Sequence, residues 1–98
     1  MAMETVMEAL ARLNGSGYVD DYRAEAEGLR NRSTGAVAPP EAFEVDEIVR
    51  FEGDSDPSDE SAIFALRSRA DRRRGTYTVA YGPMMDGLDA EMVRRLGR

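Results

Sequence analysis

Five acidic side chains fall within nine consecutive positions of the chain, 52–60. Asp54, Asp56 and Asp59 would place hard oxygen ligands on one tight loop, the kind of cluster that Ca²⁺ or Mg²⁺ accepts. In an EF-hand loop starting at Asp54, however, Asp59 would replace the glycine of the sixth position and Ala65 the glutamate of the twelfth. We therefore interpret the segment as a turn in which Asp and Ser side chains bond to backbone amides. Metal binding there stays an open alternative.

Five arginines gather nearby: Arg67, Arg69, Arg72, Arg73 and Arg74. Arginine binds phosphate bidentately, and Tyr77 could stack a nucleic-acid base. The net charge of −6 nevertheless disfavours nucleic acid as a partner, and charges at a hairpin tip usually protect a sheet from edge pairing. We interpret the arginines as solvated charge, with a phosphate or acidic partner as the alternative.

Carboxylates also recur along the strand-like segment 43–53, where Glu44, Asp46 and Glu52 are expected on the outer face. Two carboxylates with separated pKa values can act as general acid and base only in a cleft that excludes water, and no sequence pattern indicates such a cleft. Together with the acidic turn, these carboxylates form a candidate surface for a partner or ligand: Glu44, Asp46, Arg50, Glu52, Asp54, Asp56 and Asp59.

The residue types that are missing narrow the chemistry further. The chain has no Cys, no His and no Lys, so all thirteen basic residues are Arg. This excludes thiolate nucleophiles, imidazole bases, Schiff-base lysines and the usual zinc or haem ligands. We expect no cofactor.

Length and hydropathy bound the architecture. Ninety-eight residues suit one α+β domain, 1–98. No stretch approaches the roughly 18 apolar residues of a membrane span, and the N-terminus is unlike a secretory signal. The composition therefore predicts a cytoplasmic protein with no membrane partner.

Helical spacing predicts a first helix over residues 4–14. Its apolar stripe is Met3, Val6, Met7, Leu10 and Leu13. Thr5 and Glu8 have the spacing of a capping box, and Gly15 suits the left-handed conformation that ends many helices.

The middle of the chain predicts strands. The clearest is 43–53, where Phe43, Val45, Val49 and Phe51 share a parity and should face the core. Glu47 has the same parity, so we expect either a buried carboxylate or a bulge there. Segments 61–69 and 76–82 should complete a three-stranded antiparallel meander. Segment 18–27 favours a fourth strand, with a helix as the alternative, and 31–41 reads as a loop with one helical turn at PPEA.

A second helix is expected at the C-terminus, with Asp89 as its N-cap. Its inward side chains should be Met92, Val93 and Leu96. The predicted fold class is therefore α+β: an N-terminal helix, an antiparallel sheet of three to four strands, and a C-terminal helix, with both helices on one sheet face.

Three stretches of the sequence resemble a family of small bacterial proteins of about this length: EALARLNGSGYVDDY, PPEAFEVDEIVRFEGDSDPSDESAIFALRS and RGTYTVAYGPMMDGLDAEM. The pattern Phe-Glu-x-Asp-Glu-x-x-Arg-Phe-Glu-Gly falls on 43–53, Ser-x-Pro-x-Asp on 55–59, and Ala-Tyr-Gly on 80–82. Some members carry a phosphoribosylpyrophosphate synthetase label. The chain has no room for the two nucleotide-binding domains of such an enzyme, so the resemblance implies a shared fold without an activity.

Three functions follow from these patterns. We favour a non-enzymatic binding or accessory module that holds a protein or a small cationic ligand, because surface carboxylates are abundant and common catalytic residue types are missing. The alternatives are a small carboxylate-dependent or metal-assisted enzyme, and phosphate or nucleic-acid binding through the arginine hairpin.

Overall fold

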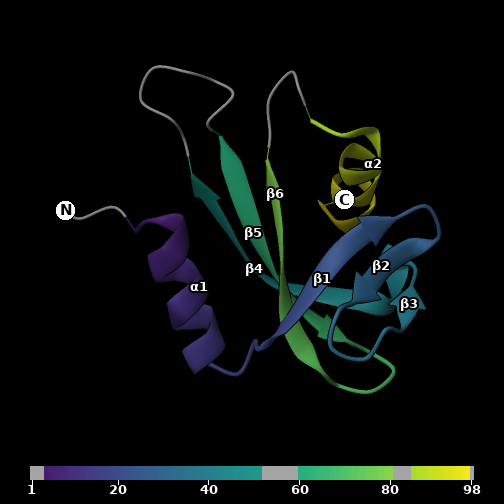
Figure 1. Cartoon of the computed structure of the whole chain (residues 1–98), viewed down its shortest axis with the longest axis horizontal. Helices are drawn as coiled ribbons and strands as arrows, with labels where there is room; N and C mark the ends of the chain where they lie inside the picture. The colour runs from purple at the N-terminus through teal and green to yellow at the C-terminus, as the bar shows by residue number, and fades with distance from the viewer. Residues whose placement is uncertain (1–3, 52–59, 81–84, 98) are drawn as a thin grey trace.

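The computed structural model describes residues 4–51, 60–80 and 85–97. Its elements are, in chain order, α1 (Val6–Gly15), β1 (Asp20–Glu25), β2 (Gly28–Asn31), β3 (Val37–Ala38), η1 (Pro40–Ala42), β4 (Phe43–Phe51), β5 (Ser61–Ser68), β6 (Arg74–Ala80) and α2 (Gly87–Gly97). These residues form a six-stranded sheet in the order β3-β2-β1-β6-β5-β4 (Figure 1). Neighbouring strands run antiparallel except β1 and β6, which are parallel. The predicted antiparallel meander of three to four strands is therefore wrong, because the sheet is larger and mixed.

The first helix has the predicted capping box, although it begins at Val6, two residues after the predicted start. The Thr5 hydroxyl accepts a hydrogen bond from the Glu8 amide, and the Glu8 carboxylate accepts one from the Thr5 amide, which completes the capping box. The predicted stripe is confirmed at Leu13, Val6 and Leu10, which pack in or against one cluster. It is wrong at Met7, which is 75% exposed, and it omitted Ala9, which is buried. The left-handed glycine after the helix is Gly17, with φ +104°, so the role assigned to Gly15 is also wrong.

The segment interpreted as a loop, 31–41, contains the two-residue strand β3, and the short strand β2 precedes it. Strand β2 pairs with β1, and the two-residue strand β3 pairs with β2 at Leu29↔Ala38 and Arg30↔Val37. Gly28 begins β2 at φ +150°, and a Cβ there would lie 2.2 Å from the Ala38 carbonyl oxygen. Glycine is therefore required at this position for the backbones to approach. The helical turn predicted at PPEA is confirmed as η1.

The predicted bulge in β4 is confirmed, and it has a consequence that the sequence analysis missed. The pairing of β4 with β5 shifts between Val45 and Glu47. One extra residue reverses the faces of the following side chains. Phe43 and Val45 consequently join one hydrophobic cluster, whereas Val49 and Phe51 join the other. The expectation that all four face one core is wrong.

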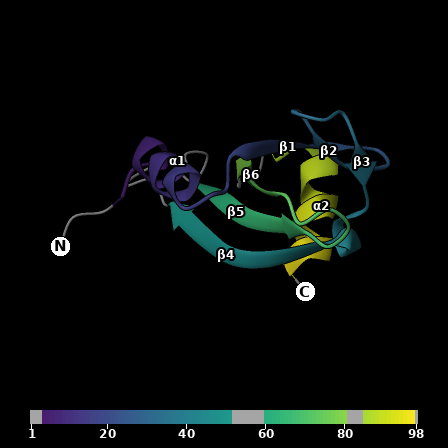
Figure 2. The same cartoon turned by 90° about the horizontal axis from the view of Figure 1, so that it is seen from below.

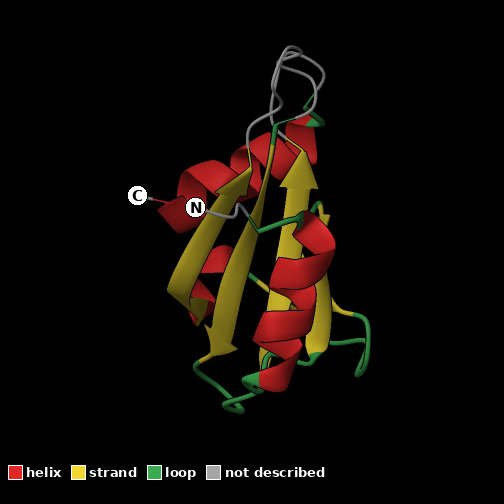
Figure 3. Cartoon of the chain, turned by 90° about the vertical axis from the view of Figure 1, so that its left-hand side faces the viewer, coloured by secondary structure: helices red, strands yellow, loops and turns green. Residues whose placement is uncertain are grey.

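The two helices cover opposite faces of the sheet. Met92 and Leu96 of α2 pack in the cluster that contains Phe64, whereas Ala9 and Leu13 of α1 pack in the cluster that contains Ile63. Adjacent residues of a strand point to opposite faces, so α1 and α2 lie on opposite sides of β5. Figure 3 shows α1 in front of the strands and α2 behind them, and Figure 2 shows the sheet curling around α2. The predicted packing on one face is wrong.

Helix α2 starts two residues before the predicted N-cap. The Asp86 carboxylate accepts a hydrogen bond from the Leu88 amide at 2.8 Å, so Asp86 caps the helix in place of Asp89. The inward positions of Met92 and Leu96 are confirmed, since they are 1% and 6% exposed. Neither helix is long and apolar enough to cross a membrane in the part of the chain that the structure describes.

The parallel contact between β1 and β6 is short. Only Asp20↔Gly75 and Asp21↔Thr76 are in register. A Cβ added to Gly75 would lie 2.3 Å from the Asp20 carbonyl oxygen and 2.8 Å from the Asp20 Cβ. Gly75 therefore allows the two strands to meet.

The substitution Gly75→Ala tests this contact. We expect it to lower the free energy of unfolding by about 1–3 kcal/mol, because the added methyl group overlaps backbone atoms that pack against it. Chemical denaturation would measure the loss. The matched control is Gly15→Ala, where a Cβ meets nothing within 4 Å, and where we expect unchanged or slightly higher stability. Equal stability of the two variants would contradict the proposed contact.

Candidate functional site

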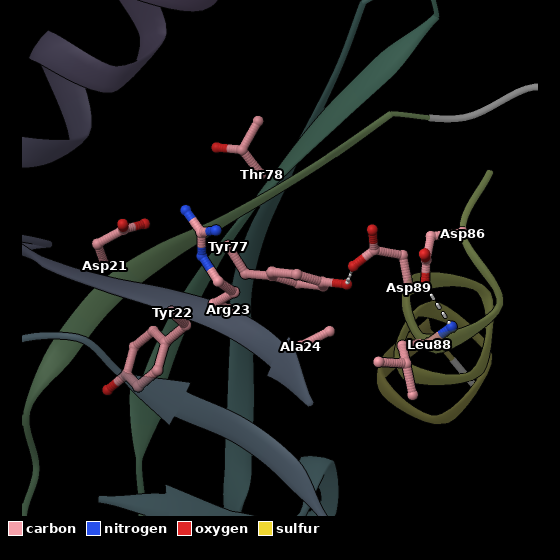
Figure 4. Close-up of a pocket in the computed structure, with 9 residues that line it drawn as sticks. All are labelled: Asp21, Tyr22, Arg23, Ala24, Tyr77, Thr78, Asp86, Leu88 and Asp89. Atoms are coloured by element: carbon pink, nitrogen blue, oxygen red, sulfur yellow. Dashed lines mark hydrogen bonds between the residues drawn. The ribbon is translucent and has the colours of Figure 1, made fainter. Parts of the chain in front are cut away.

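A cleft opens where β1 and β6 part. Beyond their two paired residues, β1 continues along β2 through Glu25, and β6 continues along β5 through Ala80. The strands diverge visibly in Figure 1. The space between them has a volume of about 410 Å³. We call this space the β1–β6 cleft, and it is lined by Asp21, Tyr22, Arg23, Ala24, Tyr77, Thr78, Asp86, Leu88 and Asp89 (Figure 4).

Both faces of the sheet contribute side chains to the cleft. Tyr22 and Tyr77 belong to the hydrophobic cluster on the α2 side. Arg23 and Thr78, being their sequence neighbours, point to the opposite face. A closed sheet would separate these two sets of side chains, so the divergence of the strands is what brings them to one opening.

A buried carboxylate fixes the closed end of the cleft. Asp20 is only 4% exposed. Its carboxylate accepts hydrogen bonds from Arg73 Nε at 2.6 Å, from Arg73 Nη2 at 3.1 Å and from Asn31 Nδ2 at 2.9 Å. These bonds join the start of β1 to the end of β2 and to the β5–β6 connection. The Arg73 guanidinium holds the pKa of Asp20 below its usual value, against the opposing effect of burial, and Asn31 assists.

The open end of the cleft carries carboxylates from the start of α2. Asp89 accepts a hydrogen bond from the Tyr77 hydroxyl at 2.5 Å, which orients both side chains. Asp86 lies beside it and is held by the Leu88 amide. At the C-terminal end of α2, Arg95 forms a bidentate ion pair with Glu41 of η1. Arg95 Nη2 lies 2.6 Å from Glu41 Oε1, and Arg95 Nε lies 2.8 Å from Glu41 Oε2. This pair lowers the pKa of Glu41 to about 2.

One guanidinium faces these carboxylates across the cleft. The Arg23 side chain makes no hydrogen bond or ion pair with any other residue that the structure describes. In Figure 4 its guanidinium lies on the opposite side of the Tyr77 ring from Asp86 and Asp89. Asp21 also lines the cleft, but its carboxylate is paired with Arg32 at 3.2 Å. The cleft therefore has a cationic end and an anionic end.

The surface predicted from the sequence is only partly described. Glu44 and Asp46 lie on β4 and form ion pairs with Arg67, at 3.0 and 2.9 Å. Arg50 is opposite Ala62, which packs on the α2 side, so it shares no face with Glu44. The remaining members, Glu52, Asp54, Asp56 and Asp59, lie outside the described residues.

The arginines of segment 67–74 contact different partners in the structure. Arg67 and Arg69 bond to Glu44, Arg73 bonds to Asp20, and Arg74 lies over the Tyr18 ring at 5.1 Å. The Arg72 side chain makes no such contact with another described residue. The continuous basic surface that a nucleic-acid strand would require is therefore not formed.

Sequence reasoning missed the residues of the β1–β6 cleft. Asp89 was assigned to helix capping, and Arg23 was not singled out. No group of three carboxylates close enough for a metal ion occurs within 4–51, 60–80 and 85–97. No family model, curated protein or solved structure matches the chain.

The role of Asp20 can be tested through the pH dependence of stability. Because its folded-state pKa is lowered, Asp20 contributes stability above its unfolded pKa of about 3.9, and this contribution is lost as the pH falls through the folded value. We expect Asp20→Asn to reduce the free energy of unfolding by about 1–3 kcal/mol at pH 7. The difference from the wild type should shrink below about pH 4.

Asp21→Asn is the matched control, because its side chain is 55% exposed and its ion pair lies at the surface. We expect its effect to stay within about 0.5 kcal/mol. Urea denaturation of the three proteins between pH 2 and pH 7 measures the comparison. Equal losses in the two variants would contradict the assigned role of Asp20.

Proposed function

We propose that this protein is a non-enzymatic binding module whose ligand occupies the β1–β6 cleft. The observation that carries this proposal is the opening of the sheet between β1 and β6, which is lined by side chains from both faces. Its volume of about 410 Å³ falls in the range of about 300–1,000 Å³ that is typical of small-molecule sites.

The charges of the cleft favour a ligand with two opposite ends. Asp86 and Asp89 would hold an ammonium group, and Arg23 would hold a carboxylate or another anionic group. Charge-assisted hydrogen bonds of this kind are stronger than those between neutral groups. The Tyr77 ring lies between the two ends and is 1% exposed, so it forms a buried wall between them. A free amino acid has this combination of groups.

Binding fits the residue types better than catalysis does. The chain lacks Cys, His and Lys, so only carboxylates, hydroxyls and guanidinium groups remain as candidate catalysts. The Asp89 carboxylate and the Tyr77 hydroxyl are bonded to each other. That bond holds two polar groups in place at the mouth of the cleft.

A titration with the standard free amino acids tests the proposal. Each would be compared with the corresponding amine, which lacks the carboxylate, by following the backbone amide resonances of the protein. We expect the shifts to concentrate on residues 21–24, 77, 78 and 86–89. Arg23→Gln should weaken binding of the amino acid by about 10- to 100-fold, the effect of losing a charged hydrogen bond. It should leave binding of the amine nearly unchanged.

The matched control is Arg94→Gln. Arg94 is exposed on α2 and bonds to Glu91, away from the cleft. Its replacement should leave both affinities unchanged. Shifts scattered over the surface, or equal losses in the two variants, would contradict a ligand site in the cleft.

A further inference from the structure

A second and smaller hollow lies at the end of β5. It is lined by Glu44, Arg67, Ser68, Arg69 and Arg72 and has a volume of about 190 Å³. We call it the arginine hollow. It shares no lining residue with the β1–β6 cleft, so nothing about it depends on the function proposed for that cleft. Its volume is about that of six water molecules in the liquid, which is small for an organic ligand but sufficient for a single compact anion.

A carboxylate holds two of the three guanidinium groups in place. Glu44 Oε1 accepts a hydrogen bond from Arg67 Nη2 at 3.0 Å, and Glu44 Oε2 accepts one from Arg69 Nη1 at 2.9 Å. Arg67 Nη2 also donates to Asp46 at 2.9 Å. Both oxygens of Glu44 are thus engaged, and the two arginines are fixed side by side before any ligand arrives. A pre-positioned pair of this kind loses less conformational entropy on binding.

Donors remain in the hollow after these ion pairs are made. Arg69 donates to Glu44 through Nη1, and its side chain is 51% exposed. The Arg72 side chain has no bonding partner among the residues that the structure describes. The backbone of Arg72 is held in the left-handed region, at φ +64°, and its amide bonds to the Ser68 carbonyl oxygen at 3.0 Å. A fixed turn therefore presents Arg72 beside the other two arginines.

The local charge is the reverse of the overall charge. The chain carries a net charge of −6, whereas the lining of the hollow contains three arginines and one carboxylate, Glu44. The guanidinium groups have N–H donors in the fork geometry that matches oxyanions.

We propose that the arginine hollow binds a single phosphate group, either as free phosphate or as the phosphoryl group of a small monoester. The hollow offers Arg72 and the remaining donors of Arg69 to the phosphate oxygens. A nucleic-acid strand is a poorer fit, because Arg73 and Arg74 are already engaged with Asp20 and the Tyr18 ring.

Titrations at constant ionic strength test this proposal, with inorganic phosphate, glycerol 3-phosphate, a short single-stranded DNA and sodium chloride as the probes. The backbone amides of the protein would be followed by NMR. We expect both phosphates to shift the amides of residues 67–72, and chloride to leave them in place. Tighter binding of glycerol 3-phosphate than of phosphate would identify a monoester as the ligand, and the reverse order would identify free phosphate.

The variant Arg72→Gln breaks no side-chain contact among the described residues, so it should fold normally, as an unchanged melting temperature would confirm. We expect its affinity for the phosphates to fall by about 10- to 100-fold. The control Arg94→Gln removes an equal charge elsewhere and should have no effect. Three results would each overturn the proposal: equal shifts with chloride, an unchanged affinity in Arg72→Gln, or DNA binding that is tighter than binding of either phosphate.

Discussion

The buried carboxylate of Asp20 is the constraint on which the arrangement of the sheet depends. It joins β1 to β2 through Asn31 and to the β5–β6 connection through Arg73. A carboxylate that is 4% exposed is tolerated only when its oxygens are bonded, so these partners have to come together when the chain folds. Parallel pairing between β1 and β6 is the result, and Gly75 provides the space for it.

The position of this constraint also explains why the cleft exists. Asp20 holds β1 and β6 together at one end only. Beyond that end, β1 pairs with β2 and β6 pairs with β5, so the two strands follow different partners. Leu29 and Gly28 of β2 pair with the second half of β1, while β5 pairs with β6 along its whole length. Twist between neighbouring strands accumulates across a sheet, and the curled sheet in Figure 2 shows its effect. The cleft is thus a product of the topology, and the side chains that line it define its chemistry.

The bulge in β4 has a comparable role at the other edge of the sheet. It turns Asp46 and Glu47 toward the α1 side, where Asp46 accepts a hydrogen bond from the Tyr18 hydroxyl and Glu47 forms an ion pair with Arg12. The same bulge divides the odd-numbered apolar side chains of β4 between the two hydrophobic clusters. A domain of 98 residues can therefore build a core on each face of its sheet from few strands.

Local patterns predicted the elements that local interactions determine. The capping box of α1, the bulge of β4, the β5–β6 hairpin and the inner face of α2 were all visible in the sequence, because each depends on residues close together in the chain. Strands β2 and β3 were not predicted, because strands of two to four residues are too short to show an alternation of apolar and polar residues. The face reversal in β4 was missed because a bulge was expected without its effect on parity.

The candidate sites show the same limit. The acidic turn and the arginine run attracted attention because their charges are adjacent in sequence. The cleft draws Arg23, Tyr77 and Asp89 from three elements, and no sequence spacing connects them. Only the parallel pairing of β1 with β6 brings them together, and such pairing between distant segments leaves no periodic signal.

The cleft exists only if β1 and β6 pair at two residues and then separate. Interstrand nuclear Overhauser effects measure this separation. We expect backbone contacts between Asp21 and Thr76, and none between Ala24 and Val79, the residues that would face each other if the ladder continued. Contacts at both positions would show a closed sheet without a cleft, and contacts at neither would show that the parallel pairing is absent.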